Sequence, residues 1–249
     1  MTVIAHLSDP HLDGTDAARD RLRRITSYLR DLRTPADVVL VSGDLADHGL
    51  PTEYAELVAE LPTDLPVLVL PGNHDVSEPL RAGVASVDSP GTDHPVHQVR
   101  DVAGARFVLV DSTVPGEDHG LLSAESLAWL DGVLQESFDG PVFVAMHHPP
   151  LVTQYDVIDQ YMLREQDALA AVLTGKPITA ILTGHIHNAM VTSFAGHPVL
   201  GAPGIRSTVA LAFEPPAPGG GYIDTATLPG LALHVVLPGL PLQTYYRFP

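Results

Sequence analysis

Residues 3–11, with the sequence VIAHLSDPH, run from a short apolar segment directly into Asp9 and His11, two side chains that commonly bind metal ions. The apolar segment has the length and the β-branched content of a buried strand. The two polar side chains therefore follow the point where that strand is expected to end. The same succession recurs four more times along the chain, and this repetition determines the fold that we predict.

Six short runs are rich in aliphatic and β-branched residues and predict buried strands. They span residues 3–7, 38–41, 67–70, 107–110, 142–146 and 178–182. Leucine and isoleucine recur at helical spacing between the first two runs and again before the fifth, where Ser123 is the expected N-cap. Residues 162–174 predict a further helix. This alternation indicates an α/β domain with largely parallel pairing in its first part.

From residue 190 onward the pattern changes to short strands separated by glycine and proline turns. The expected strands span residues 190–195, 198–202, 208–213, 223–226 and 231–237. These strands could form a second sheet that packs on the first. We find no internal repeat and no composition boundary, so the sequence predicts a single domain over residues 1–249.

The chain has 249 residues, a formal net charge of −17 and no cysteine. The lack of cysteine excludes disulfides, thiolate zinc sites and a cysteine nucleophile. The negative charge disfavours nucleic-acid polymers and anionic membrane surfaces as partners. The N-terminal residues lack the basic and apolar regions of a signal peptide, and no apolar run approaches the roughly 18 residues of a spanning helix. The sequence therefore predicts a cytoplasmic protein.

Seven side chains that follow predicted strands could bind metal ions, and the carboxyl ends of strands in an open α/β sheet face one crevice. They are Asp9, His11, Asp44, Asn73, His147, His185 and His187. This nitrogen and oxygen set suits transition metals better than calcium or magnesium. Seven ligands are too many for one catalytic ion, but they fit two ions about 3.5–4 Å apart, with Asp44 as the natural bridge. If the segments are extended, the two side chains of Asp9-x-His11 share one face, as do those of His185-x-His187.

Five motifs in this order give the chain a family resemblance. They are Asp9-x-His11, Gly43-Asp44-x-x-Asp47, Gly72-Asn73-His74-Asp75, His147-His148-Pro149-Pro150 and Gly184-His185-x-His187. The set resembles the calcineurin-like metallophosphoesterases, and in particular the bacterial class III cyclic-nucleotide phosphodiesterases and their glycerophosphodiesterase relatives. The resemblance implies an α/β fold with four layers, an αββα sandwich of two mixed β-sheets flanked by helices.

The resemblance also implies how the ligands divide between two ions. Asp9, His11, Asp44 and His187 would hold one ion, and Asp44, Asn73, His147 and His185 would hold the other. In relatives the pair is iron with manganese or zinc, or two manganese ions, and the sequence does not choose between them. The expected reaction is in-line attack on phosphorus by a hydroxide that bridges the two ions.

Substrate-contacting roles are expected for residues beside these ligands. The resemblance implies that His74 stabilises a phosphoryl oxygen or protonates the leaving alkoxide, while Asp75 could orient it as a second catalytic residue. Asn73 and His74 are also expected to contact substrate. The loop that contains Tyr155 and Tyr161 could cover the cleft and stack a base, and Tyr155 is the substrate-binding candidate there.

Other polar residues near these motifs are expected to have structural roles. Asp47 and His48 follow Asp44 and are predicted to be structural or exposed. His148 is predicted to point away from the ions and to support their ligands. Solvated or hydrogen-bonded side chains are expected for six histidines that carry no motif: His6, His94, His97, His119, His197 and His234.

We therefore expect a metal-dependent phosphoric diester hydrolase that acts on small phosphodiesters, first of all 3′,5′-cyclic nucleotides such as cyclic AMP. The motifs leave open a glycerophosphodiesterase or a broad-specificity phosphomonoesterase, and more remotely a non-catalytic scaffold of the same fold. The predicted partner is a small-molecule phosphodiester. Relatives often dimerise, and the sequence neither specifies nor excludes a homodimer.

Overall fold

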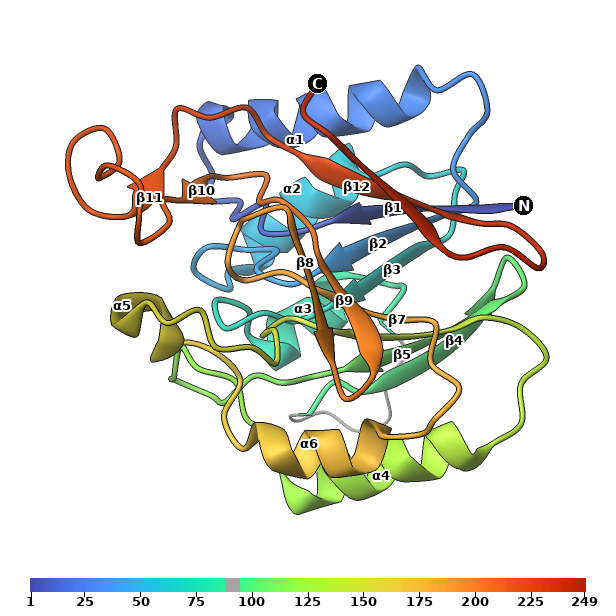
Figure 1. The fold of residues 1–249 in the computed structure, drawn as a ribbon. Coiled ribbons are helices and arrows are strands. Elements are labelled where there is room, and N and C mark those ends of the chain that lie inside the picture. The colour runs from blue at the N-terminus through green and yellow to red at the C-terminus, as the bar shows by residue number, and fades with distance from the viewer. Residues whose placement is uncertain (88–94) are drawn as a thin grey trace.

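Two mixed β-sheets lie face to face in the computed structural model, which describes residues 1–87 and 95–249 (Figure 1). The first sheet has the order β13-β12-β1-β2-β3. Its strands are β1 (Thr2–Leu7), β2 (Val38–Ser42), β3 (Val67–Leu70), β12 (Leu231–Val236) and β13 (Gln243–Arg247). Strands β1, β2 and β3 are parallel, and β12 joins β1 in antiparallel register, with His6 opposite Ala232.

The second sheet has the order β4-β5-β6-β7-β9-β8, and its central strands β5, β6, β7 and β9 are parallel. Its strands are β4 (Gln98–Val102), β5 (Ala105–Val110), β6 (Val142–Met146), β7 (Ala180–Thr183), β8 (Met190–Phe194) and β9 (His197–Gly201). A separate short hairpin pairs β10 (Thr208–Val209) with β11 (Ile223–Asp224).

Helices cover the outer face of each sheet (Figure 1). The helices are α1 (Asp16–Arg30), α2 (Pro51–Glu60), α3 (Ser77–Gly83), α4 (Ala124–Gln135), α5 (Asp156–Asp159) and α6 (Gln166–Leu173). Side chains of α1 and α2 pack on the first sheet, and those of α4 and α6 pack on the second. Ser123 caps α4, as predicted, because its side chain accepts a hydrogen bond from Ser126 N.

Strand alternation produces these layers. In β2, Val39 and Val41 point toward the helices, whereas Val38 and Leu40 point toward the second sheet. In β5, Phe107 likewise belongs to the apolar layer between the sheets. Each central strand is therefore buried on both faces, which explains its nearly continuous apolar sequence. The predicted four-layer αββα sandwich is confirmed. The expectation that the strands after residue 190 form the second sheet is wrong, because β8 and β9 join the sheet of β5–β7 whereas β12 joins the sheet of β1.

Some elements were not predicted. Strands β4 and β13 are edge strands with several polar residues, so they lack a continuous apolar run. Helices α3 and α5 have only seven and four residues, and α2 was also not predicted. The helix expected at residues 162–174 begins only at Gln166, after Glu165, which has a left-handed backbone. The strand expected at residues 208–213 is limited to Thr208–Val209.

The histidines without motifs in the described chain have polar partners. His6 Nδ1 lies 3.1 Å from His234 Nε2 between two strands of the first sheet, and His197 Nε2 donates to Leu173 O. His97 bonds to Ser126, and His119 lies beside Glu117. His94 lies outside the described residues. Across residues 1–87 and 95–249, no helix has both the length and the apolar composition that crossing a membrane requires.

Candidate metal centre

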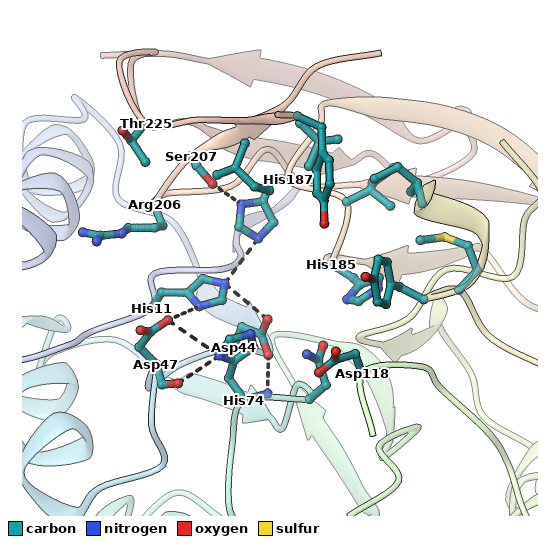
Figure 2. Close-up of a pocket in the computed structure, with 18 residues that line it drawn as sticks. His11, Asp44, Asp47, His74, Asp118, His185, His187, Arg206, Ser207 and Thr225 are labelled. Atoms are coloured by element: carbon teal, nitrogen blue, oxygen red, sulfur yellow. Dashed lines mark hydrogen bonds and ion pairs between the residues drawn. The ribbon is translucent and has the colours of Figure 1, made fainter. Parts of the chain in front are cut away.

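Five loops that follow parallel strands meet at one edge of the sandwich and carry the seven predicted ligands. The loops leave the carboxyl ends of β1, β2 and β3 in the first sheet and of β6 and β7 in the second. Backbone bonds join the first two loops, with Asp9 N donating to Gly43 O at 3.1 Å and His11 N donating to Asp44 O at 2.9 Å. Both sheets thus contribute side chains to one cavity (Figure 2).

Four predicted ligands form one compact group, with candidate ligand atoms that lie within 4.8 Å of one another. The four are Asp9, His11, Asp44 and His187, and all are buried. His11 Nε2 lies 3.3 Å from His187 Nε2. Two nitrogens that bind one ion at about 2.0–2.1 Å in tetrahedral geometry are about 3.3–3.4 Å apart, so this spacing fits a shared ion.

A second pair of imidazoles lies beside this group. His147 Nε2 is 3.3 Å from His185 Nδ1, the same spacing as in the first group. His148 is close to both rings, but Nε2 of His148 donates to Asp118 O and Nδ1 accepts from Ser112 Oγ at 2.8 Å. Both nitrogens of His148 are therefore used by the protein. His148 is thus a structural residue rather than a ligand, but the prediction that it points away from the ions is wrong, because its ring lies beside those of His147 and His185.

Asp44 lies between the two groups. Its Oδ2 is 3.2 Å from His11 Nε2 and 3.4 Å from His147 Nε2. Its other oxygen, Oδ1, accepts a hydrogen bond from His74 N at 3.0 Å. One oxygen thus faces a nitrogen from each group while the backbone fixes the carboxylate. This is the position expected of a bridging ligand.

Asn73 supplies an independent test of whether a cation fits here. Its Oδ1 is buried and has no hydrogen-bond partner in the part of the chain that the structure describes. Such an orphaned acceptor is costly unless a group outside the protein satisfies it. Gly72 lets this loop approach Asp44, because a methyl group at Gly72 would overlap Asp44 Oδ1. The donor set, the orphaned oxygen and the close approach fit a metal ion.

Three ligand imidazoles use their second nitrogen to fix the ring. Each turns Nε2 toward the centre because Nδ1 is bonded to a protein group. The partners are Asp47 Oδ1 for His11 at 2.9 Å, Ser42 O for His147 at 2.8 Å and Ser207 Oγ for His187 at 2.7 Å. Asp47, predicted as structural or exposed, is therefore part of the site.

Five of the seven predicted ligands have a left-handed backbone. Their φ angles are 54° at Asp9, 43° at His11, 49° at Asp44, 70° at His185 and 53° at His187. The expectation that each Asp-x-His or His-x-His pair shares one face of an extended segment is thus wrong, although the pairs do converge. Such angles cost about 1–3 kcal/mol each in non-glycine residues and concentrate at functional sites.

The buried carboxylates shift the pKa of the imidazoles around them. Burial alone would lower the pKa of His11 and His147, but Asp44 outweighs it and raises these values to about 10 and about 9. Burial alone would raise the pKa of Asp9, but His187 and His147 lower it to about 2. The centre therefore attracts positive charge, and cations that bind there would replace protons.

His74 lies at the border of this centre. Its Nδ1 donates to Asp47 O at 2.9 Å and lies 3.6 Å from Asp47 Oδ1, which leaves Nε2 available to the cavity that the ring lines. The expectation that Asp75 orients His74 is wrong. Both oxygens of Asp75 accept bonds from other groups, including Leu45 N and Gly72 N, so Asp75 joins two ligand loops as a structural residue.

A cavity of about 520 Å³ opens over the ligands (Figure 2). Predicted site residues line it: His11, Asp44, Asn73, His74, His185 and His187. Tyr155, the predicted substrate-binding residue, does not line this cavity but a neighbouring pocket of about 110 Å³. Tyr161, from the same segment, lines the main cavity.

Asp118, Arg206 and Tyr222 line the cavity and, like Ser207, were not predicted. Asp118 follows β5, so the rule that strand ends carry function could have found it. Arg206 and Tyr222 come from the region around the β10–β11 hairpin, where no motif marks them. Figure 2 shows Arg206 and Asp118 on opposite sides of the cavity.

Comparison with known proteins gives a family and several relatives. The family model for calcineurin-like phosphoesterase matches residues 2–189, the part of the chain that carries all seven candidate ligands. A probable cyclic nucleotide phosphodiesterase of Rhodococcus erythropolis is 38% identical over 79% of this chain and 68% of its own length. A cAMP/cGMP dual specificity phosphodiesterase of Mycobacterium tuberculosis is 35% identical over 79% of this chain and 65% of its own. The chain thus spans about two thirds of the length of these relatives.

Among solved structures, a purple acid phosphatase from yellow lupin seeds matches 99% of this chain and 51% of its own chain, with a TM-score of 0.70. The two sequences are 14% identical, so this likeness concerns the fold alone.

Proposed function

The chain belongs to the calcineurin-like phosphoesterase family, and from that premise we propose a dinuclear metal-dependent phosphodiesterase that prefers 3′,5′-cyclic nucleotides such as cyclic AMP. The broader class, a phosphoric diester hydrolase, is confirmed by the family match and by relatives that are named as phosphodiesterases. The metal stoichiometry and the cyclic substrate are the parts that we propose.

The observation that carries the proposal is the position of Asp44 between two imidazole groups. Its Oδ2 lies 3.2 Å from His11 Nε2 and 3.4 Å from His147 Nε2. One group offers Asp9, His11 and His187, and the other offers Asn73, His147 and His185, each sharing Asp44. The unpartnered Oδ1 of Asn73 supports a second ion, because the first ion already has four candidate ligands in Asp9, His11, Asp44 and His187.

The chemistry that divalent ions supply in such a pair is a lowered pKa for coordinated water and charge compensation for the phosphoryl oxygens. The residues around them have separate tasks. Asp47, Ser42 and Ser207 orient the ligand rings so that each Nε2 faces inward. We assign His74 to the leaving group, because its Nε2 is available to the cavity while its Nδ1 is fixed by Asp47 O.

His74 would give a proton to the leaving oxygen from its Nε2 atom. With Nδ1 donating to Asp47 O, a second proton on Nε2 makes the ring an imidazolium. As the attacking oxygen bonds to phosphorus, cleavage of the ester bond leaves the bonding electron pair on the alkoxide oxygen, which takes the Nε2 proton and becomes a hydroxyl group. In a 3′,5′-cyclic nucleotide this hydroxyl group stays on the product, because the reaction opens the ring. The carboxylate of Asp47, 3.6 Å from Nδ1, offsets the charge of the imidazolium.

Small diesters are favoured over polymers because of charge. The chain has a net charge of −17, and Arg206 is the single Lys or Arg among the described residues that line the cavity. A nucleic-acid polymer requires a basic track for its backbone. A single scissile phosphate requires only the local positive charge that bound cations provide.

A substrate panel tests the proposal. The manganese-loaded protein is assayed with cyclic AMP, 2′,3′-cyclic AMP, glycerophosphocholine and p-nitrophenyl phosphate. We expect the highest kcat/KM for cyclic AMP. A highest value for glycerophosphocholine would favour a glycerophosphodiesterase, and one for p-nitrophenyl phosphate would favour a phosphomonoesterase. No turnover with two bound ions would favour a scaffold.

A further inference from the structure

We propose that the cavity contains a nucleobase subsite, in which the base stacks on an aromatic wall and donates a hydrogen bond to Asp118. What we call the aromatic wall consists of the two tyrosines Tyr161 and Tyr222 and three apolar, non-aromatic residues, Ile158, Met162 and Val209, all of which line the cavity. This inference rests on the proposed function, because it names the residues that would distinguish a cyclic nucleotide from other small diesters.

The aromatic wall joins two segments that are distant in the sequence. Ile158 and Met162 belong to α5 and the turn after it, and Val209 belongs to β10 of the hairpin. These three side chains form one buried apolar cluster with Ile186, and Tyr222 packs against it. Because Ile186 lies between the candidate ligands His185 and His187, the wall is continuous with the metal centre.

The two tyrosines of the wall come from different elements. Burial and the neighbouring Tyr161 raise the pKa of Tyr222. Tyr161 follows α5 and Tyr222 directly precedes β11, and both line the cavity where these elements lie on the same side of the molecule (Figure 1). A flat ligand in the cavity can therefore stack on an aromatic ring. Stacking of a base on an aromatic side chain is also tolerant of base identity.

Asp118 provides a hydrogen-bond acceptor at the edge of the aromatic wall. It is exposed, and Figure 2 shows it on the same side of the cavity as His185. Asp118 lines the same cavity as Tyr161 and Tyr222, and its charge contributes to the raised pKa of Tyr222. No residue in the described part of the chain donates a hydrogen bond to this carboxylate, so a ligand can.

Charge and shape favour a base over other groups at this position. A second anionic group would be repelled by Asp118, whereas Arg206, the cation of the cavity, is bonded to Asp13 at 3.0 Å on the opposite side. A quaternary ammonium group is usually enclosed by aromatic faces, but here aliphatic side chains make up much of the wall. A planar heterocycle with N–H donors matches an apolar wall that has one carboxylate at its edge.

The test uses two ligands that differ only in the base. Calorimetry on the manganese-loaded protein compares adenosine 5′-monophosphate with ribose 5-phosphate, and turnover of cyclic AMP is measured in parallel. The variants are Tyr161→Leu, Tyr222→Leu and Asp118→Asn. Matched controls are Tyr245→Leu on β13 and Asp139→Asn, two exposed positions that do not line the cavity.

We expect the wild-type protein to bind the nucleotide about tenfold more tightly than ribose 5-phosphate, the magnitude of one stacked base. Each of the three variants should reduce this ratio severalfold, and the controls should keep it. Equal affinity for both ligands in the wild-type protein would overturn the subsite. A variant that loses affinity for ribose 5-phosphate as strongly as for the nucleotide would overturn it too, since the effect would then lie in the metal centre.

Two further results separate this inference from the proposed function. If the wild-type protein prefers the nucleotide but does not hydrolyse cyclic AMP, the proposed function fails and the subsite stands. If it hydrolyses cyclic AMP without any preference for the nucleotide over ribose 5-phosphate, the function stands and the subsite fails. A third result would overturn the subsite in favour of a cationic headgroup. In that case the protein would show no preference for the nucleotide, and it would bind glycerophosphocholine tightly but lose this binding in Tyr222→Leu.

Discussion

Asp47 Oδ1 accepts a hydrogen bond from His11 Nδ1 at 2.9 Å, so the ring of His11 can turn only Nε2 toward the candidate metal centre. Removal of this partner should weaken metal binding without unfolding the chain. Asp47→Ala is expected to lower manganese affinity about 10–100-fold, as loss of a ligand-orienting group does. Isothermal calorimetry on Asp47→Ala and on the exposed control Asp139→Ala checks this; equal affinities in the two would contradict it.

His74 should matter most when the leaving group needs a proton. We expect His74→Gln to keep both ions and to lower kcat about 10²–10⁴-fold for cyclic AMP, whose leaving group is an alkoxide. The loss should be much smaller for bis-p-nitrophenyl phosphate, because nitrophenolate departs without a proton. Steady-state kinetics with both substrates, together with metal analysis, measure this difference. An equal loss for both substrates would rule out the proton-donor role.

Gly72 should tolerate no side chain, because a methyl group there would overlap Asp44 Oδ1. We expect Gly72→Ala to displace the Asp44 carboxylate and to lower manganese affinity at least about tenfold. Gly132→Ala in α4 is the matched control, since nothing lies within 4 Å of an added methyl there. That change should slightly stabilise the protein. Unchanged metal affinity in Gly72→Ala would show that metal binding does not require the close approach of the Gly72 backbone to Asp44.

A buried histidine pair should make the protein sensitive to acid. Burial lowers the pKa of His234 to about 3, against about 6.5 in the unfolded chain. The unfolded chain therefore binds the proton first, so stability present above pH 6.5 is lost as the pH falls toward 3. Between pH 7.5 and 5 this amounts to about 2 kcal/mol.

Urea denaturation of the metal-free protein at pH 7.5 and pH 5 measures this loss. His234→Gln should lose about 2 kcal/mol less over that interval than the wild-type protein. His6, which bonds to His234 and is also buried with a lowered pKa, remains in both proteins. An identical loss in both proteins would show that His234 does not carry the effect.

The sequence predicts which residues form the candidate site, but it does not predict the backbone geometry of those residues. Strands buried on both faces leave continuous apolar runs, so the ends of β1, β2 and β6, and hence Asp9, Asp44 and His147, could be placed from the sequence. The left-handed angles at Asp9 and His187 could not be foreseen, because they are imposed by contacts between loops from both sheets. Extended geometry was the natural but wrong assumption.

Roles that depend on long-range contacts were also beyond the sequence. Asp75 is adjacent to His74 in sequence, yet its carboxylate accepts bonds from Leu45 N and Ala46 N in another loop. Asp47, expected to be structural or exposed, holds His11 and His74 instead. The choice between Tyr155 and Tyr161 depends on how α5 and its flanking turns pack, and no periodic signal encodes this. Edge strands such as β13 lack the continuous apolar pattern that marks the buried strands.

Metal stoichiometry tests the central claim, a two-ion centre bridged by Asp44, most directly. Elemental analysis is made on the wild-type protein and on Asp44→Asn after both are loaded with manganese and desalted under the same conditions. We predict about two ions per chain in the wild-type protein and a loss of both in folded Asp44→Asn. One ion or none per wild-type chain, or two ions retained by Asp44→Asn, would contradict the account.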